Sequence, residues 1–176
     1  MKKTSSVRRM AFSAIIAAVY AALTMALGFM SYNGIQFRVA EALCVLPFFF
    51  PSTAWGVFVG CFIANLISPA GILDIVFGSM STLLCCLSIA ALGRRGSRGW
   101  LRCLTVCLMP VVFNALIVGA VLAFTIADPG MGFGAAFVFF GGQVALGEAV
   151  VMFTLGLVLM RSLPRMKLFA MLQEKL

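Results

Sequence analysis

Long stretches without charged side chains are the feature of this sequence that most restricts its fold. The run Cys103–Ile126 contains no charged residue, and Ala135–Met160 contains only Glu148. About 20 apolar residues in a helix cross the hydrocarbon core of a bilayer, and both runs reach that length. Of the 176 residues, 63% are hydrophobic and 10% are charged, whereas soluble domains carry about 25% charged residues. The chain is therefore predicted to be an integral membrane protein.

The hydrophobic pattern predicts an all-α protein, a compact bundle of six transmembrane helices in one membrane domain covering residues 1–176. The second and third segments are each about a dozen residues long and are separated by Phe50-Pro51-Ser52. They are either two short helices or one re-entrant hairpin. Ser68-Pro69 is predicted to start the fourth helix. The expected helices are approximately 10–30, 40–50, 53–67, 71–92, 102–126 and 135–161, followed by a cytoplasmic tail, 162–176.

The basic residues predict the orientation of these segments. Basic residues precede the first run, as in a signal peptide, but the run is long enough to span and is predicted to be a retained helix. With both termini in the cytoplasm, every one of the 13 basic residues except Arg38 falls on the cytoplasmic side. This positive-inside pattern predicts a multi-pass protein of a prokaryotic cell membrane.

Composition and missing motifs exclude several functional classes. The chain has 6 cysteines in or beside apolar runs, no C-x-x-C pair and no histidine, which argues against a metal site or a disulfide framework. The net charge of +8 lies in short clusters between apolar runs, so it is a topology signal rather than a nucleic-acid surface. No phosphate-binding loop or hydrolase motif is present. We therefore expect that this chain is not an enzyme and holds no cofactor. If it transports a solute actively, a partner protein must supply the energy.

Small residues recur every four positions on two segments. Gly56, Gly60 and Ala64 form such a row in the third segment. Similar spacing in the first segment occurs at Ala14, Ala18 and Ala22, with a neighbouring row at Ala17 and Ala21. Rows of this kind allow close helix packing in lipid. Each row serves either packing within the bundle or docking of a partner protein.

Two acids, Glu148 and Asp74, lie where their charge needs a reason, whereas a third, Asp128, does not. Glu148 is near the middle of the last segment, where a carboxylate is costly unless it is paired or hydrated, so a functional role competes with a protonated, helix-bonded one. Asp74 begins a face that continues with Gly78, Ser81 and Cys85, although an acid is also favoured at a helix amino terminus. Asp128, in Asp-Pro-Gly, is predicted to occupy an ordinary exposed turn.

The stretch IQFRVAEAL, residues 35–43, carries Arg38 and Glu41 three positions apart between apolar runs. They either pair with each other at a helix start or line a ligand pocket, with Arg38 orienting Glu41 or acting as a gate. Amide groups at Asn65, Asn114 and Gln143 either bond neighbouring helices or join that pocket. The outer half of the chain is net acidic, which favours a cationic or donor-rich ligand.

Four stretches resemble the QueT family of substrate-binding (S) components of energy-coupling factor transporters, associated with uptake of queuosine precursors. They are IQFRVAEALCVLPFF, GCFIANLISPAGILDIVFGSMSTL, FNALIVGAVL and GGQVALGEAVVMFTLGLVL. The resemblance extends from about Met10 to Met160. It departs at Ala40 and Cys44, where the family pattern has Ser and Thr.

The resemblance implies six segments with cytoplasmic ends and a ligand site in the outer half of the membrane. It also implies that Ala14, Ala18 and Ala22 dock on a coupling membrane protein (EcfT). An ATPase pair (EcfA and EcfA′), which holds the ATP and Mg, then drives toppling of the S component and release of the substrate.

The resemblance further implies a ligand such as 7-aminomethyl-7-deazaguanine. Its guanine-like edge donates two N–H groups that one carboxylate can accept, and its aminomethyl group is cationic. The expected ligand contacts are the carboxylates of Glu41, Asp74 and Glu148, together with Arg38. The expected amide contacts are Gln36, Asn65, Asn114 and Gln143, and the expected stacking rings are Phe37 and Phe77. Two alternatives remain, namely a proton-coupled carrier for a small cationic or nucleobase-like solute, and a protein whose polar residues only pack helices.

Overall fold

The computed structural model describes residues 2–28, 37–94, 99–128 and 130–175. Within these ranges the secondary structure is entirely helical. The α-helices are α1 (Lys2–Ala26), α3 (Leu46–Phe49), α4 (Thr53–Asn65), α5 (Ser79–Gly93), α6 (Trp100–Thr125), α7 (Phe133–Val151), α8 (Leu157–Ser162) and α9 (Lys167–Lys175). Two 3₁₀ segments, η1 (Val39–Val45) and η4 (Leu163–Arg165), and two π-helical segments, η2 (Asp74–Gly78) and η3 (Met152–Gly156), continue or join them.

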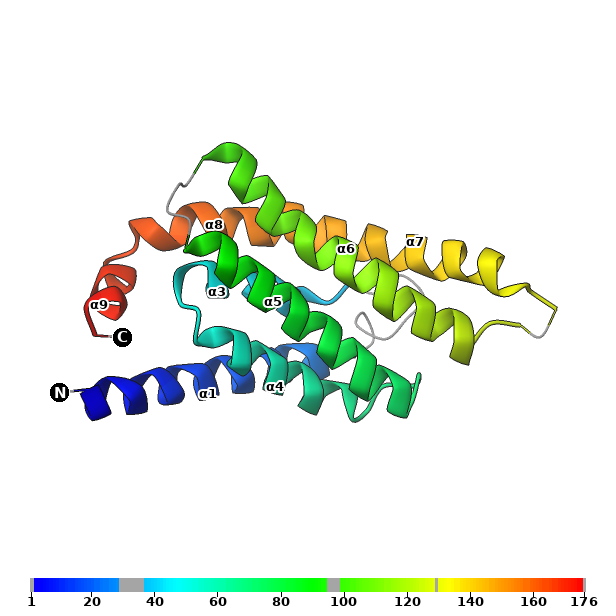
Figure 1. Cartoon of the computed structure of the whole chain (residues 1–176), viewed down its shortest axis with the longest axis horizontal. Helices are drawn as coiled ribbons and strands as arrows, with labels where there is room; N and C mark the ends of the chain where they lie inside the picture. Colours follow the sequence, from blue (N-terminus) through cyan, green and yellow to red (C-terminus); the bar gives the residue numbers. More distant parts are fainter. Residues whose placement is uncertain (1, 29–36, 95–98, 129, 176) are drawn as a thin grey trace.

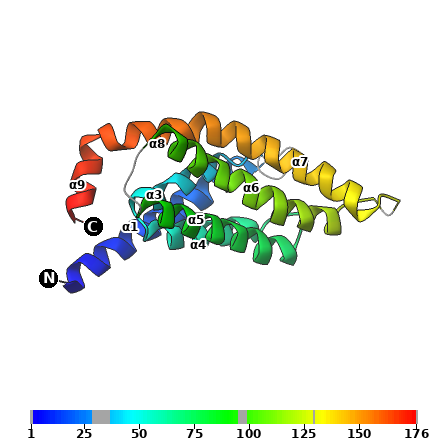
Figure 2. The same cartoon turned by 45° about the horizontal axis from the view of Figure 1, so that its top comes forward.

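The helices form an elongated bundle with both chain ends at one end of it (Figure 1). The turn from α3 to α4 and the start of α6 lie toward that end, and the turns from α4 to α5 and from α6 to α7 lie toward the other. Helix α9 leaves the direction of α8 and lies across the end that carries the termini (Figure 2). Helix α9 occupies part of residues 162–176, which the sequence predicts to be a cytoplasmic tail.

Two helix pairs make the most extensive contacts, α6 with α7 and α1 with α4. In the first pair, a Cβ atom added to Gly119 would lie only 2.6 Å from the Cα atom of Gly141. In the second, a Cβ atom on Gly60 would lie 2.6 Å from the carbonyl oxygen of Ala17, and one on Gly56 would overlap the carbonyl oxygen of Ser13. The small-residue row of α4 therefore lets α1 approach within the bundle, as expected for close packing in lipid.

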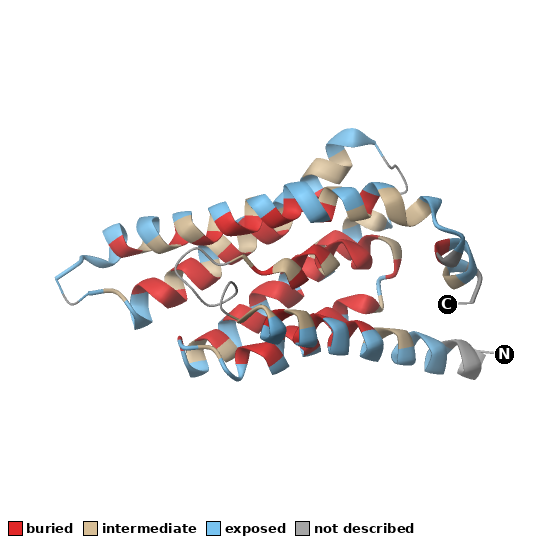
Figure 3. Ribbon diagram, turned by 180° about the vertical axis from the view of Figure 1, so that it is seen from behind, coloured by how far each residue is buried: buried red, intermediate tan, exposed pale blue. Residues whose placement is uncertain are grey.

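The distribution of side chains is that of a protein surrounded by lipid. Large apolar side chains cover much of the outside; Leu101 and Phe124, for example, are 77% and 75% exposed. Arg38, Glu41 and Glu148 are buried together with other polar residues. Figure 3 shows the buried positions on the helix faces that point into the bundle. Four described helical stretches are long and apolar enough to cross a membrane: 6–26, 74–93, 100–125 and 133–165. Two shorter apolar helices are Val39–Phe49 and Thr53–Asn65.

The predicted start of the fourth helix at Ser68-Pro69 is wrong. These residues form a turn in which the backbone N–H of Gly71 donates to the carbonyl oxygen of Ser68 at 3.2 Å. Gly71 has φ +71°, a left-handed conformation that a helix cannot include and that favours glycine. The helix therefore begins after Gly71, and Asp74 lies in its first turn.

Candidate functional site

Asp74 is the centre of one buried group of polar contacts. It begins the π-helical segment η2, a geometry that often occurs at functional sites. Its Oδ2 atom lies 3.4 Å from Nη2 of Arg38 and accepts a hydrogen bond of 2.5 Å from the hydroxyl of Ser68. Arg38 and Asp74 are both buried, so this ion pair joins the start of η1 to the start of η2 inside the bundle.

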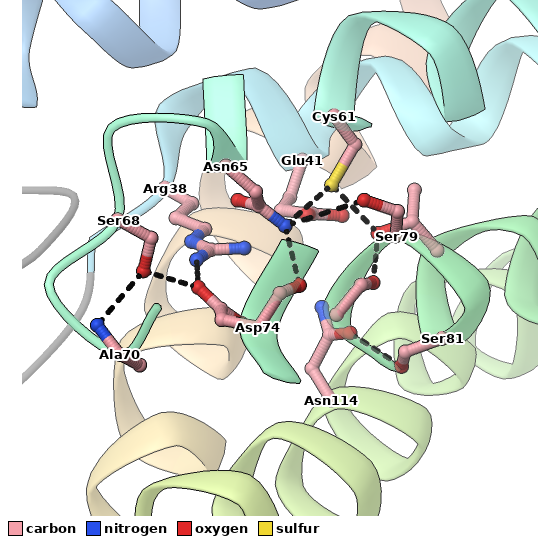
Figure 4. A network of polar contacts seen from close by, with 12 residues as sticks. Arg38, Glu41, Cys61, Asn65, Ser68, Ala70, Asp74, Ser79, Ser81 and Asn114 are labelled. Atoms are coloured by element: carbon pink, nitrogen blue, oxygen red, sulfur yellow. Dashed lines mark hydrogen bonds and ion pairs between the residues drawn. The ribbon is translucent and has the colours of Figure 1, made fainter. Parts of the chain in front are cut away.

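Asn65, the last residue of α4, holds η2 from the other side. Its Nδ2 atom donates to the backbone carbonyl of Asp74 at 3.2 Å and lies 3.5 Å from Oγ of Ser79. Gly78 leaves room for this arrangement, because a Cβ atom there would lie 3.0 Å from Nδ2 of Asn65 and 2.5 Å from Oδ1 of Asp74. The amide of Asn65 and the carboxylate of Asp74 therefore share one small buried region (Figure 4).

Glu41 lies on η1, and donors reach both of its carboxylate oxygens. The hydroxyl of Tyr20 donates to Oε1 at 2.5 Å, and the thiol of Cys44 donates to Oε2 at 2.9 Å. In a 3₁₀ helix, side chains three positions apart are eclipsed, which brings Cys44 over Glu41. Arg38 is paired with Asp74 rather than with Glu41, which argues against the first of the two alternatives, a local ion pair.

Glu148 is held from the opposite side of the bundle. Ser81 of α5 donates to Oδ1 of Asn114 at 2.7 Å, and Nδ2 of Asn114 donates to Oε1 of Glu148 at 2.9 Å. This chain crosses from α5 through α6 to α7. Helix α6, which carries Asn114, also contacts η2, which carries Asp74. The two groups of polar residues therefore lie on neighbouring elements of the bundle.

The buried groups leave acceptor atoms unused. Four buried side-chain oxygens have no hydrogen-bond partner among the described residues: Asn65 Oδ1, Asp74 Oδ1, Gln143 Oε1 and Glu148 Oε2. Buried acceptors are normally satisfied, so each needs an explanation. The buried carboxyl groups just described number three, and one buried guanidinium group accompanies them, which leaves an excess of two acidic groups. Such an arrangement can bind a ligand that donates several hydrogen bonds and carries positive charge.

The remaining predicted ligand contacts are placed differently. Gln36 lies outside the described residues, and Phe37 is half-buried beside Arg38. Phe77 is 49% exposed and lines an apolar groove on the outside of the bundle with Leu116 and Phe124. The structure thus places Phe77 outside the polar group formed by Asp74, Asn65 and Glu148.

The two alanine rows of α1 have opposite environments. Ala17 and Ala21 are buried, whereas Ala14, Ala18 and Ala22 are exposed on the outer face of the helix. The structure therefore leaves the predicted docking row accessible and uses the neighbouring row for contact with α4.

Several site residues were not predicted from the sequence. They are Tyr20, Cys61, Ser68 and Ser79. A signal for Tyr20 existed: Tyr20 and Thr24 place two hydroxyl groups four residues apart in an apolar run, and so on one helix face. Both are fully or almost fully buried.

Comparisons with known proteins point to one family. A model of the QueT transporter family matches residues 10–165 of this chain. The Queuosine precursor transporter QueT of Lactococcus lactis subsp. cremoris (strain MG1363) is 42% identical over 73 residues, which is 40% of this chain and 43% of that protein. The match thus spans less than half the length of that curated relative. No solved structure matches this chain significantly.

Proposed function

This chain belongs to the QueT transporter family, and on that premise we propose that it is the substrate-binding membrane subunit of an energy-coupling factor importer. It captures a queuosine precursor from outside the cell and delivers it after docking on a coupling module. The relative from Lactococcus lactis, a Queuosine precursor transporter by name, supports this substrate class. We assign no catalytic role to this chain and assign ATP hydrolysis to partner subunits.

The observation that carries the proposal is the set of unused buried oxygens. A queuosine precursor such as 7-aminomethyl-7-deazaguanine offers N1–H, an exocyclic amine and an ammonium group. Glu148 has a neutral amide, Asn114, as its hydrogen-bond partner, so its charge suits the ammonium group. Asp74 is paired with Arg38, so its free oxygen and that of Asn65 suit the uncharged N–H groups of the base edge.

The remaining predicted contacts belong to the same proposed pocket as Glu148 and Asp74. Glu41, already bonded by Tyr20 and Cys44, adds negative charge to the pocket wall. Gln143 has an unused buried oxygen on α7, five residues before Glu148. These residues, with Arg38 as the orienting partner of Asp74, complete a donor-accepting pocket.

The transport cycle requires partners. In this proposal the chain has six membrane segments with both termini in the cytoplasm, and its ligand pocket lies toward the outer half of the membrane. The exposed row Ala14, Ala18 and Ala22 docks on the coupling protein EcfT, because small residues permit close helix contact in lipid. ATP hydrolysis by EcfA and EcfA′ then drives toppling of this subunit and release of its ligand.

Calorimetry on the purified chain tests the substrate assignment. We expect saturable binding of 7-aminomethyl-7-deazaguanine without ATP, and weaker binding of guanine and of the 7-cyano analogue, which lack the ammonium group. No binding heat at micromolar ligand contradicts the assignment. Uptake by the chain alone, driven by a proton gradient and abolished by an uncoupler, would support the proton-coupled carrier instead.

A further inference from the structure

A cavity lies at the end of the bundle that carries both termini, away from the buried carboxylates. Its volume is about 690 Å³. Its described walls come from α1, the turn 49–52, the end of α5 and α9. The polar side chains in these walls include Arg9, Arg94 and Gln173. The proposed transport cycle gives this cavity no task.

The charge of the described lining residues favours an anion. Two guanidinium groups line it, and none of its described lining residues is acidic. Ser52, also in the wall, is the residue before the amino terminus of α4, a helix of 13 residues. The amino terminus of a helix carries partial positive charge and favours anions. Guanidinium groups bind phosphate through several parallel hydrogen bonds.

The other walls are apolar and held in place by packing. Phe49, Phe50 and Pro51 line the cavity beside the arginines. The ring of Phe169 on α9 packs against Phe49 and Phe50, with centroids 5.2 Å and 5.3 Å apart. Phe169 is buried, and Gln173 follows it one helical turn later. The cavity thus combines a cationic rim with an apolar wall that the packing of α9 completes.

We propose that this cavity binds the phosphate group of an anionic phospholipid from the adjacent leaflet. The arginines bind the phosphate, and the phenylalanine and proline side chains contact the glycerol and upper acyl chains. A phosphate on a small soluble molecule shares the ionic contact but has no acyl chain for the apolar wall. Basic pockets between membrane helices are suited to anionic headgroups.

Native mass spectrometry and titration of the full chain in detergent test the proposal. Short-chain phosphatidylglycerol is compared with phosphatidylcholine of the same chain length and with inorganic phosphate and glycerol phosphate. The variants are the double substitution Arg9→Gln/Arg94→Gln and the single substitution Gln173→Glu, which adds an acid without removing an arginine. Arg165→Gln is the matched control, since Arg165 is exposed near the same end but is not among the described lining residues.

We expect saturable binding of one phosphatidylglycerol, weakened roughly tenfold or more by the double substitution. Gln173→Glu should weaken it in the same direction, and Arg165→Gln should change it less than about twofold. Equal binding of phosphatidylcholine, or normal binding by both pocket variants, overturns the proposal. Soluble phosphates that bind as tightly as phosphatidylglycerol would retain the phosphate site but refute its lipid source. Unchanged binding of 7-aminomethyl-7-deazaguanine by the variants separates this site from the proposed transport site.

Discussion

Glu148→Gln separates ligand binding from folding at the proposed transport site. Glutamine keeps the shape of the side chain and an oxygen that can accept the hydrogen bond from Asn114, 2.9 Å long in the native protein. It removes the negative charge and replaces the unused acceptor Oε2 with a donor group. Ligand affinity and stability should therefore change in opposite directions.

The magnitudes follow from the two environments of this carboxylate. A hydrogen bond to a charged group contributes about 1.5–3 kcal/mol, so losing one from Oε2 to an ammonium group weakens Kd about 10- to 100-fold. In the ligand-free protein, the carboxylate is buried with one oxygen unpaired among the described residues. Removing that uncompensated charge should raise the free energy of unfolding by about 1 kcal/mol.

Calorimetry with 7-aminomethyl-7-deazaguanine measures the affinity, and thermal melting in detergent measures the stability. The matched control is Glu41→Gln, because both oxygens of Glu41 already accept hydrogen bonds from Tyr20 and Cys44. We expect Glu41→Gln to weaken binding less than about fivefold and to give no gain in stability. Unchanged affinity in Glu148→Gln, or a joint fall in affinity and stability, would refute the assignment of Glu148 as the ammonium acceptor.

Three other substitutions test the surrounding structure. Ala18→Leu, on the exposed face of α1, should abolish transport and co-purification with EcfT but leave ligand binding unchanged. Ala17→Leu, on the buried face, should lower the melting temperature. The opposite pattern would mean that the two faces are misassigned. Gly56→Ala pushes a methyl group into an α1 carbonyl and should cost about 1–3 kcal/mol of stability, and an unchanged melting temperature counts against this close packing. Arg38→Met leaves the buried carboxylate of Asp74 without its ion-pair partner and should lower the free energy of unfolding by about 3–5 kcal/mol. The double variant that adds Asp74→Asn should recover part of this stability. A purely additive loss of stability would argue against the ion pair.

Much of the helical organisation was predictable because lipid restricts a chain more than water does. Apolar runs must form helices that satisfy their own backbone hydrogen bonds, so helices α5, α6 and α7 follow from run length and composition. The separate cost of exposing a charge to lipid explains why Glu148, near the middle of an apolar run, could be expected to face the inside of the bundle. The spacing of Gly56 and Gly60 also predicted a close helix contact, but it left open whether the contact lay within the bundle or with a partner protein.

The identity of each polar partner was not predictable from local spacing. Arg38 has an acid three residues away, at Glu41, yet pairs with Asp74, 36 residues away in the chain. That choice depends on how the start of η1 meets η2, which the sequence does not encode locally. Similarly, with 17 phenylalanines in the chain, spacing alone did not reveal that Phe77 faces outward.

Helix α1 connects the proposed ligand pocket with the proposed docking face. Tyr20 is fully buried and donates to Glu41, while Ala18 and Ala22 on either side of it in the chain are exposed. One short segment thus contacts the pocket wall from inside and presents the docking row outside. We therefore expect a ligand that alters the hydrogen bond between Tyr20 and Glu41 to act on the position of this segment.

Tyr20→Phe tests whether this connection carries energy. The loss of one buried donor should cost about 1–3 kcal/mol of stability, because Oε1 of Glu41 loses its partner. If the hydrogen bond couples the two faces, ligand should change the affinity for EcfT about fivefold or more in the wild type, and by less in Tyr20→Phe. The affinity for EcfT is measured with and without ligand in both proteins, which gives one affinity ratio for the wild type and one for Tyr20→Phe. Equal ratios would mean that Tyr20 supports the fold of the pocket but that α1 does not transmit its occupancy through this bond.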